Sequence, residues 1–184
     1  MNENKDYLLK GAMAYGMSFG IFWVFKYVFF ILSMQVAFLG VVYWGMSVTV
    51  PYLAYILSKK YKQVIGGRIS FFHAWQFGML LYFFAALIVS LVHYIFYQYL
   101  APADYIANSY KQAIEMMKSA NMDSSIIEAL QNMETPNAIS MTIQGIFNNI
   151  MYGIVLAIPV AAIVCRGYNS SESPKQENTD NTIE

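Results

Sequence analysis

The sequence predicts an all-α integral membrane protein, a four-helix bundle with a short two-helix extracytoplasmic insertion between its third and fourth spans. Three observations favour this fold class: four long apolar runs, 58% hydrophobic residues, and only 12% charged residues in a chain of 184. The charged fraction is far below the ~25% typical of a soluble domain. A helix needs about 20 apolar residues to cross a bilayer, and each run is longer than that.

The four predicted spans are approximately residues 7–32, 35–57, 71–97 and 139–165, and none contains an Asp or Glu. The first run is too long for the core of a signal peptide, so we expect it to remain attached. The short connection at Ser33 and Met34 predicts a tight antiparallel hairpin of the first two spans. Residues 1–166 would then form one membrane domain, and the polar residues 167–184 a disordered cytoplasmic tail.

The distribution of basic residues predicts the orientation of the chain. The segment between the second and third spans, residues 58–70, carries Lys59, Lys60, Lys62 and Arg68 and no acid. Short loops rich in Lys and Arg are held on the cytoplasmic side of a membrane. Alternate crossing from this anchor places both termini in the cytoplasm and residues 101–138 outside it.

Residues 101–138 are too many for a bare loop, and their pattern indicates two short helices. Apolar residues recur at helical spacing in both halves: Ile106, Tyr110, Ala113, Ile114 and Met117, then Ile126, Ile127, Leu130 and Met133. Asn121 marks a break, Asp123 or Ser124 can cap the second helix, and Pro136 ends it. Each helix is too short to be stable alone, so we expect both to lie on the bundle or on the lipid surface.

Small residues predict where the spans pack, because helices in lipid associate by close backbone approach. The first span has a GxxxG pair, and the third and fourth carry further small residues along one face; the expected packing glycines are Gly16, Gly20, Gly78, Gly145 and Gly153. Tyr82 interrupts the small-residue face of the third span.

Polar residues on three spans fall at a similar depth. Lys26 lies seven residues before Ser33, about 10 Å below the turn at 1.5 Å per residue, and His93 and Gln144 come out at that level, with Asn148 and Asn149 one turn deeper. A cation inside a membrane is a candidate functional residue, and such a layer could form a small outward-opening cavity that holds an anionic head group. The alternative remains that Lys26 extends its ammonium to the head groups and that the amides only join helices.

No pattern in the sequence indicates catalysis. We find no Cys/His/acid cluster with metal-ligand spacing and no set of residues for nucleophilic catalysis, and therefore expect no catalytic residue, metal or cofactor. The bulk charge implies no nucleic acid partner, whereas the apolar runs imply membrane lipid as one.

Several ordered features resemble the bacterial family known as domain of unknown function 4199. They are the basic loop ending in Gly66-Gly67-Arg68-Ile69-Ser70-Phe71, the aromatic end of the third span before Ala101-Pro102, the acidic helical segment, and the stretch from Gly153 to Pro159. The similarity covers about residues 6–166. It implies a small protein of the bacterial inner (cytoplasmic) membrane with no assigned activity. The family looks as if it accompanies membrane glycosyltransferases that use lipid-linked sugars, which implies such an envelope protein as a partner.

Three functions compete. The first is a non-enzymatic accessory or scaffold protein of the cell envelope. The alternative is a small transporter or flippase-like unit using the polar layer, although the spans lack a carboxylate that could couple proton movement. A membrane enzyme ranks third, because acid-base catalysis needs a positioned pair of titratable groups. The sequence does not specify the substrate, the oligomeric state or the physiological process.

Overall fold

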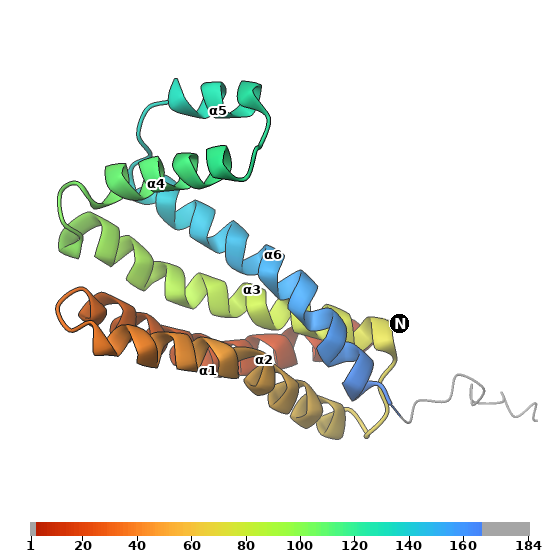
Figure 1. The fold of residues 1–184 in the computed structure, drawn as a ribbon. Helices are drawn as coiled ribbons and strands as arrows, with labels where there is room; N and C mark the ends of the chain where they lie inside the picture. Colours follow the sequence, from red (N-terminus) through yellow and green to blue (C-terminus); the bar gives the residue numbers. More distant parts are fainter. Residues whose placement is uncertain (1–2, 167–184) are drawn as a thin grey trace, which may run out of the picture.

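A computed structural model describes residues 3–166 of the chain, with side chains from residue 7 onward. Within this part every regular element is helical, and four long helices dominate: α1 (Glu3–Ser33), α2 (Phe38–Val64), α3 (Phe71–Ile95) and α6 (Ala138–Val164) (Figure 1). A π-helical turn, η1 (Phe96–Leu100), prolongs α3. The four helices are long and apolar enough to cross a membrane, which indicates a multi-pass membrane protein.

The boundaries of α2 differ most from the expected ones. It begins three residues later than residue 35 and continues to Val64, seven residues beyond the predicted end at residue 57. The basic segment is therefore mostly helical instead of a loop. The physical reason is that this segment buries Ser58 and Tyr61 while Lys59 and Lys60 stay exposed, so one face is covered and the chain remains helical.

Capping interactions set the ends of two long helices. Ser70 caps α3, because its hydroxyl accepts a hydrogen bond from the backbone N–H of His73 at 3.3 Å. Asn137 caps α6 in the same way, accepting from Ser140 N–H at 2.9 Å. Both residues have the extended backbone that an N-cap adopts. The turn before α3 contains Gly66 and Gly67 at positive φ (98° and 78°), a conformation that side chains disfavour.

Helix α3 is the central element of the fold. It packs most extensively against α6 and α1, while α2 contacts α1 and α6 and touches α3 only lightly. The helices therefore follow the order α1, α3, α6, α2 around the assembly. In Figure 1, α6 crosses the other long helices obliquely.

Two short helices, α4 (Tyr105–Ser119) and α5 (Ser124–Gln131), connect η1 to α6. Asn121, at φ 53°, lies in the turn between them, and Asp123 caps α5 by accepting hydrogen bonds from the backbone N–H and the hydroxyl of Ser125 (2.8 and 2.7 Å). Tyr110 joins the two by donating to the carbonyl of Leu130 at 2.8 Å. Figure 1 shows this pair stacked beyond one end of the long helices, with α5 the farther. The predicted tail, 167–184, lies outside the described residues.

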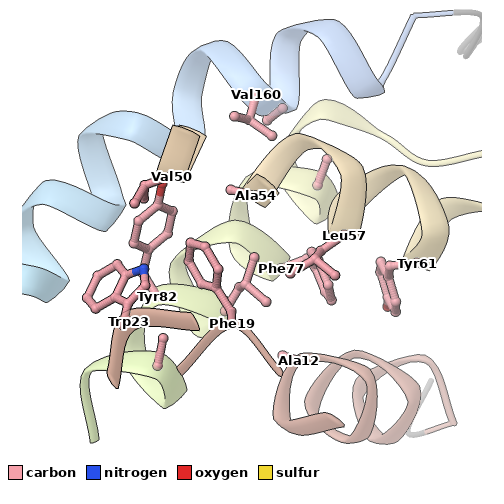
Figure 2. Close-up of a cluster of buried hydrophobic side chains, with 14 of the residues drawn as sticks. Ala12, Phe19, Trp23, Val50, Ala54, Leu57, Tyr61, Phe77, Tyr82 and Val160 are labelled. Carbon is pink, nitrogen blue, oxygen red and sulfur yellow. The ribbon is translucent and has the colours of Figure 1, made fainter. Parts of the chain in front are cut away.

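The core contains several aromatic rings from α1 and α3 (Figure 2). Phe19 and Phe77 are fully buried, and the ring of Tyr82 packs edge-on against Phe19 (5.2 Å between centroids) and Trp23 (5.7 Å). Tyr61 stacks on Phe77 at 4.0 Å with the rings nearly parallel. Aromatic residues thus supply much of the packing between α1, α2 and α3.

Candidate functional site

Close approach of the helices at small residues positions the candidate site. A Cβ atom added to Gly16 would lie 2.6 Å from the Cβ of Phe84, and one added to Gly20 would lie 2.8 Å from that of Ile88. These two glycines therefore let α1 approach α3 closely.

The other predicted packing glycines lie between α3 and α6. A Cβ on Gly78 would meet Ala157 at 2.6 Å, one on Gly153 would overlap the Cβ of Tyr82, and one on Gly145 would lie 3.3 Å from Nδ1 of His93. Tyr82, which interrupts the small-residue face of α3, thus occupies the space that Gly153 leaves open on α6. The five glycines place α1, α3 and α6 in direct contact, which brings their polar residues together.

A small cavity of about 100 Å³ opens among all four long helices. We call it the Lys26 cavity, and its lining residues are Trp23, Lys26, Tyr27, Tyr43, Val89, His93 and Asn149. Three of the five polar residues expected to share a layer, from α1, α3 and α6, therefore line one space. Tyr43 of α2 completes the wall. No sequence signal singled it out, because an aromatic residue in a span is ordinarily assigned to packing.

The ammonium of Lys26 lies between two aromatic rings. Its Nζ is 5.4 Å from the ring centroid of Trp23, three residues deeper on α1, and 5.1 Å from that of Tyr43. A cation within about 6 Å of a ring centroid is attracted by the electrons of the ring. The ammonium therefore lies close to rings of both α1 and α2.

His93 is held between α1 and α6. Its ring packs edge-on against Tyr27 at 4.1 Å between centroids, and its Nδ1 faces the backbone at Gly145. This nitrogen is buried and has no hydrogen-bond partner among the described residues. The indole N–H of Trp23 is in the same condition. The hydroxyl of Tyr27 is the third such atom. Buried polar atoms are usually paired, so three unpaired ones on residues that line one cavity identify it as unusual.

The remaining two residues of the predicted layer lie elsewhere. Gln144 and Asn148 are exposed and line a separate cavity of about 250 Å³ between α6, η1 and the α4–α5 pair. Asn148 and Asn149 are neighbours in sequence, so their side chains point about 100° apart around α6. The predicted layer is consequently divided between two adjacent cavities.

A larger pocket of about 540 Å³ lies at the opposite end of the long helices. We call it the His73 pocket, and its lining residues are Tyr7, Tyr61, Val64, Ile65, Arg68, Ile69, Ser70 and His73. Two of its polar groups pair with each other: the Tyr61 hydroxyl and His73 Nε2 are hydrogen-bonded at 2.8 Å. No pattern in the sequence singled out His73. The pair depends on the helical continuation of α2 beyond residue 57, which places Tyr61 opposite His73. A prediction that ends this helix at residue 57 therefore does not find the pair.

Lys62 joins the same end of the molecule to the end of α6. Its Nζ donates to the backbone carbonyls of Val164 (2.8 Å) and Arg166 (3.1 Å). The last carbonyls of a helix have no partner within the helix, and a cation there is stabilising. Lys62 therefore joins α2 to the C-terminal end of α6, and we call this contact the Lys62 clamp. This role is separate from the contribution of Lys62 to the predicted membrane orientation.

The part of the chain that the structure describes holds no group of three or more His, Cys, Asp or Glu residues that could bind a metal ion. The chemistry available in the Lys26 cavity is that of a cation, an imidazole, an indole and an amide. These groups can bind and orient an anion.

Comparison with known proteins identifies a family. The family model described as "Protein of unknown function (DUF4199)" matches residues 14–166. No curated protein and no solved structure matches the chain.

Proposed function

Because the chain belongs to the DUF4199 family, whose description names no activity, we propose its function from its own geometry. The protein is a non-enzymatic accessory or scaffold protein of the bacterial cell envelope. It forms a four-helix bundle in the inner membrane with both termini in the cytoplasm, and the α4–α5 pair lies outside the membrane. The basic segment at the end of α2 supports this orientation.

The observation that carries the proposal is the solid middle of the bundle. Phe19, Phe77 and Leu81 are fully buried, with Tyr82 almost so, and they lie between the Lys26 cavity and the His73 pocket. His73 and His93 are twenty residues apart on α3, which is about 30 Å at 1.5 Å per residue. A close-packed apolar layer in that interval leaves no polar path through one copy of the chain. It therefore supports a scaffold function and not a transport function.

The α4–α5 pair supports a role in association with another protein. Large apolar side chains are exposed in the segment that contains this pair: Met116 (65%), Ile126 (47%) and Met133 (63%). The same segment also carries the acidic residues Glu115 and Glu128. We propose as the partner another integral protein of the envelope, with membrane glycosyltransferases the first class to test.

Site-specific photocrosslinking in native membranes tests this function. A photoreactive residue at Met116 is expected to give one discrete crosslinked protein, identified by mass spectrometry, whereas the same residue at exposed Lys111 on α4 gives less of it. Crosslinking to lipid alone at both positions contradicts the scaffold function. Transport of a lipid or solute by the purified protein in vesicles would favour the transporter or flippase-like alternative.

A further inference from the structure

We propose that the Lys26 cavity is a binding site for one phosphate group, carried by an anionic phospholipid or present as free phosphate. This inference goes beyond the scaffold function and does not depend on it. It rests on three properties of the cavity: an uncompensated positive charge, unpaired hydrogen-bonding groups and a small volume.

The charge of Lys26 has no acidic counterpart. The carboxylates among residues 7–166 all lie between Asp104 and Glu134, in the segment that contains α4 and α5, and none lines the cavity. Within those residues the ammonium contacts two aromatic rings and forms no ion pair. Ring faces attract a cation but accept none of its three N–H bonds in the manner of an oxygen. An anion would supply both the missing charge and the missing acceptors.

The other groups around the cavity are suited to the same ligand. Trp23 is 94% buried, at 6% exposure, and its indole N–H, which is donor-only, has no partner. His93 has one unpaired buried nitrogen, and the amide of Asn149 can donate two hydrogen bonds. Oxygens of a phosphate group accept hydrogen bonds from the indole N–H, from the amide and from the imidazole nitrogen when that nitrogen carries a proton. Charge-assisted hydrogen bonds of this kind are the strong ones.

The size of the cavity restricts the ligand to a small group. Its volume of about 100 Å³ equals the space of roughly three water molecules. Pockets for drug-sized molecules begin at about 300 Å³. One phosphate group is compatible with this space, and the remainder of a phospholipid would lie outside it between the helices. The depth of about 10 Å below the turn after Ser33 is within reach of a lipid head group.

Fluorescence of Trp23 provides the measurement. The full chain carrying Trp44→Phe and Trp75→Phe retains Trp23 as its sole tryptophan. It is purified in dodecyl maltoside, which contains no phosphate, and titrated separately with inorganic phosphate, short-chain phosphatidylglycerol and short-chain phosphatidylcholine. Saturable change in Trp23 emission on addition of phosphate or phosphatidylglycerol is the expected result.

Variants connect the response to the cavity. Lys26→Met is expected to weaken binding by about tenfold or more, the effect of losing one charge-assisted hydrogen bond. Lys26→Arg keeps the charge and is expected to retain binding within a few-fold. Lys111→Met removes a positive charge from the exposed surface of α4 and is expected to leave binding unchanged. Thermal unfolding of each variant establishes that it is folded.

The two ligand sources give different results. Saturation by phosphatidylglycerol alone identifies a lipid-borne phosphate, and saturation by inorganic phosphate identifies a site open to the free ion. Absence of a saturable response to either, or the same response in folded Lys26→Met, overturns the proposal. Since the readout is binding to the isolated protein, its failure would leave the crosslinking test of the scaffold function unaffected.

Discussion

The two ends of the long helices use their polar residues in opposite ways. At the end that holds the His73 pocket, Tyr61 is hydrogen-bonded to His73 and Lys62 binds two backbone carbonyls at the end of α6. At the end that holds the Lys26 cavity, the ammonium of Lys26 lies near two aromatic rings, and buried polar atoms of Trp23, Tyr27 and His93 lack partners among the described residues. A paired polar group stabilises the fold, whereas an unpaired one that lines a cavity is available to a ligand. The buried hydroxyls of Ser58 and Tyr82 are also unpaired, but neither residue lines the Lys26 cavity or the His73 pocket. The difference teaches that polar residues of similar type, in one set of packed helices, can be structural or binding groups according to what faces them.

The largest effect on stability is expected at the contact between α3 and α6, because both helices extend between the two ends. Gly153→Leu would force a side chain into the space of Tyr82 and is expected to cost about 3 kcal/mol of stability by overpacking. Gly45→Leu is the matched control, because a Cβ there meets nothing within 4 Å, and its effect should stay within about 1 kcal/mol. Thermal unfolding in detergent measures both, and equal effects would contradict the close approach at Gly153.

Removal of the Lys62 clamp tests the paired end. Lys62→Met deletes both hydrogen bonds to the carbonyls of α6 and is expected to destabilise the protein by about 1–2 kcal/mol. Hydrogen exchange should increase at the last turn of α6, including Val164. Lys60→Met, which removes an exposed charge two residues earlier, is the control. If the two variants exchange alike, Lys62 does not hold the end of α6.

Substitution of Lys26 tests whether the lysine at the other end contributes less to stability than Lys62 does. Lys26→Met in detergent without phosphate is expected to change stability by less than about 0.5 kcal/mol, because the loss of two cation–π contacts is offset by removal of a charge from apolar surroundings. The thermal unfolding midpoint of Lys26→Met is measured and compared with that of Lys62→Met. A loss as large as that of Lys62→Met would make Lys26 a structural residue like those of the opposite end.

The smallest expected effect concerns the cap of α5, beyond the unpaired end. Hydrogen bonds from the hydroxyl and backbone N–H of Ser125 lower the pKa of Asp123 below its ordinary value. A lowered folded-state pKa means that the cap stabilises α5 above the ordinary pKa of about 4 and that this stabilisation is lost as the pH falls through the lower, folded value. The amide shift of Ser125, followed by NMR, should titrate with a midpoint below 4. Asp123→Asn removes that titration, and a midpoint above 4 would contradict the capped geometry.

Local patterns in the sequence were sufficient to predict the four long helices of the fold. Run length and the absence of acids predicted four apolar helices, and the structure has four long apolar helices. The start of α3 was predicted at its observed residue, whereas the end of α2 was seven residues too early. That error arose because a run of lysines resembles a loop in composition, although a helix with Tyr61 on its covered face accommodates the same residues.

Residue order alone determined the depth of each polar side chain and the positions of the small residues, because helix rise converts sequence separation directly into distance along the axis. Only the tertiary structure decided the rotation of each helix about that axis. Rotation places Asn149 in the Lys26 cavity and Asn148 in the neighbouring one, joins Tyr43 to Lys26, and seats Tyr82 against Gly153. These contacts depend on the shapes of the facing helices, which the spacing of residues within a single helix does not specify.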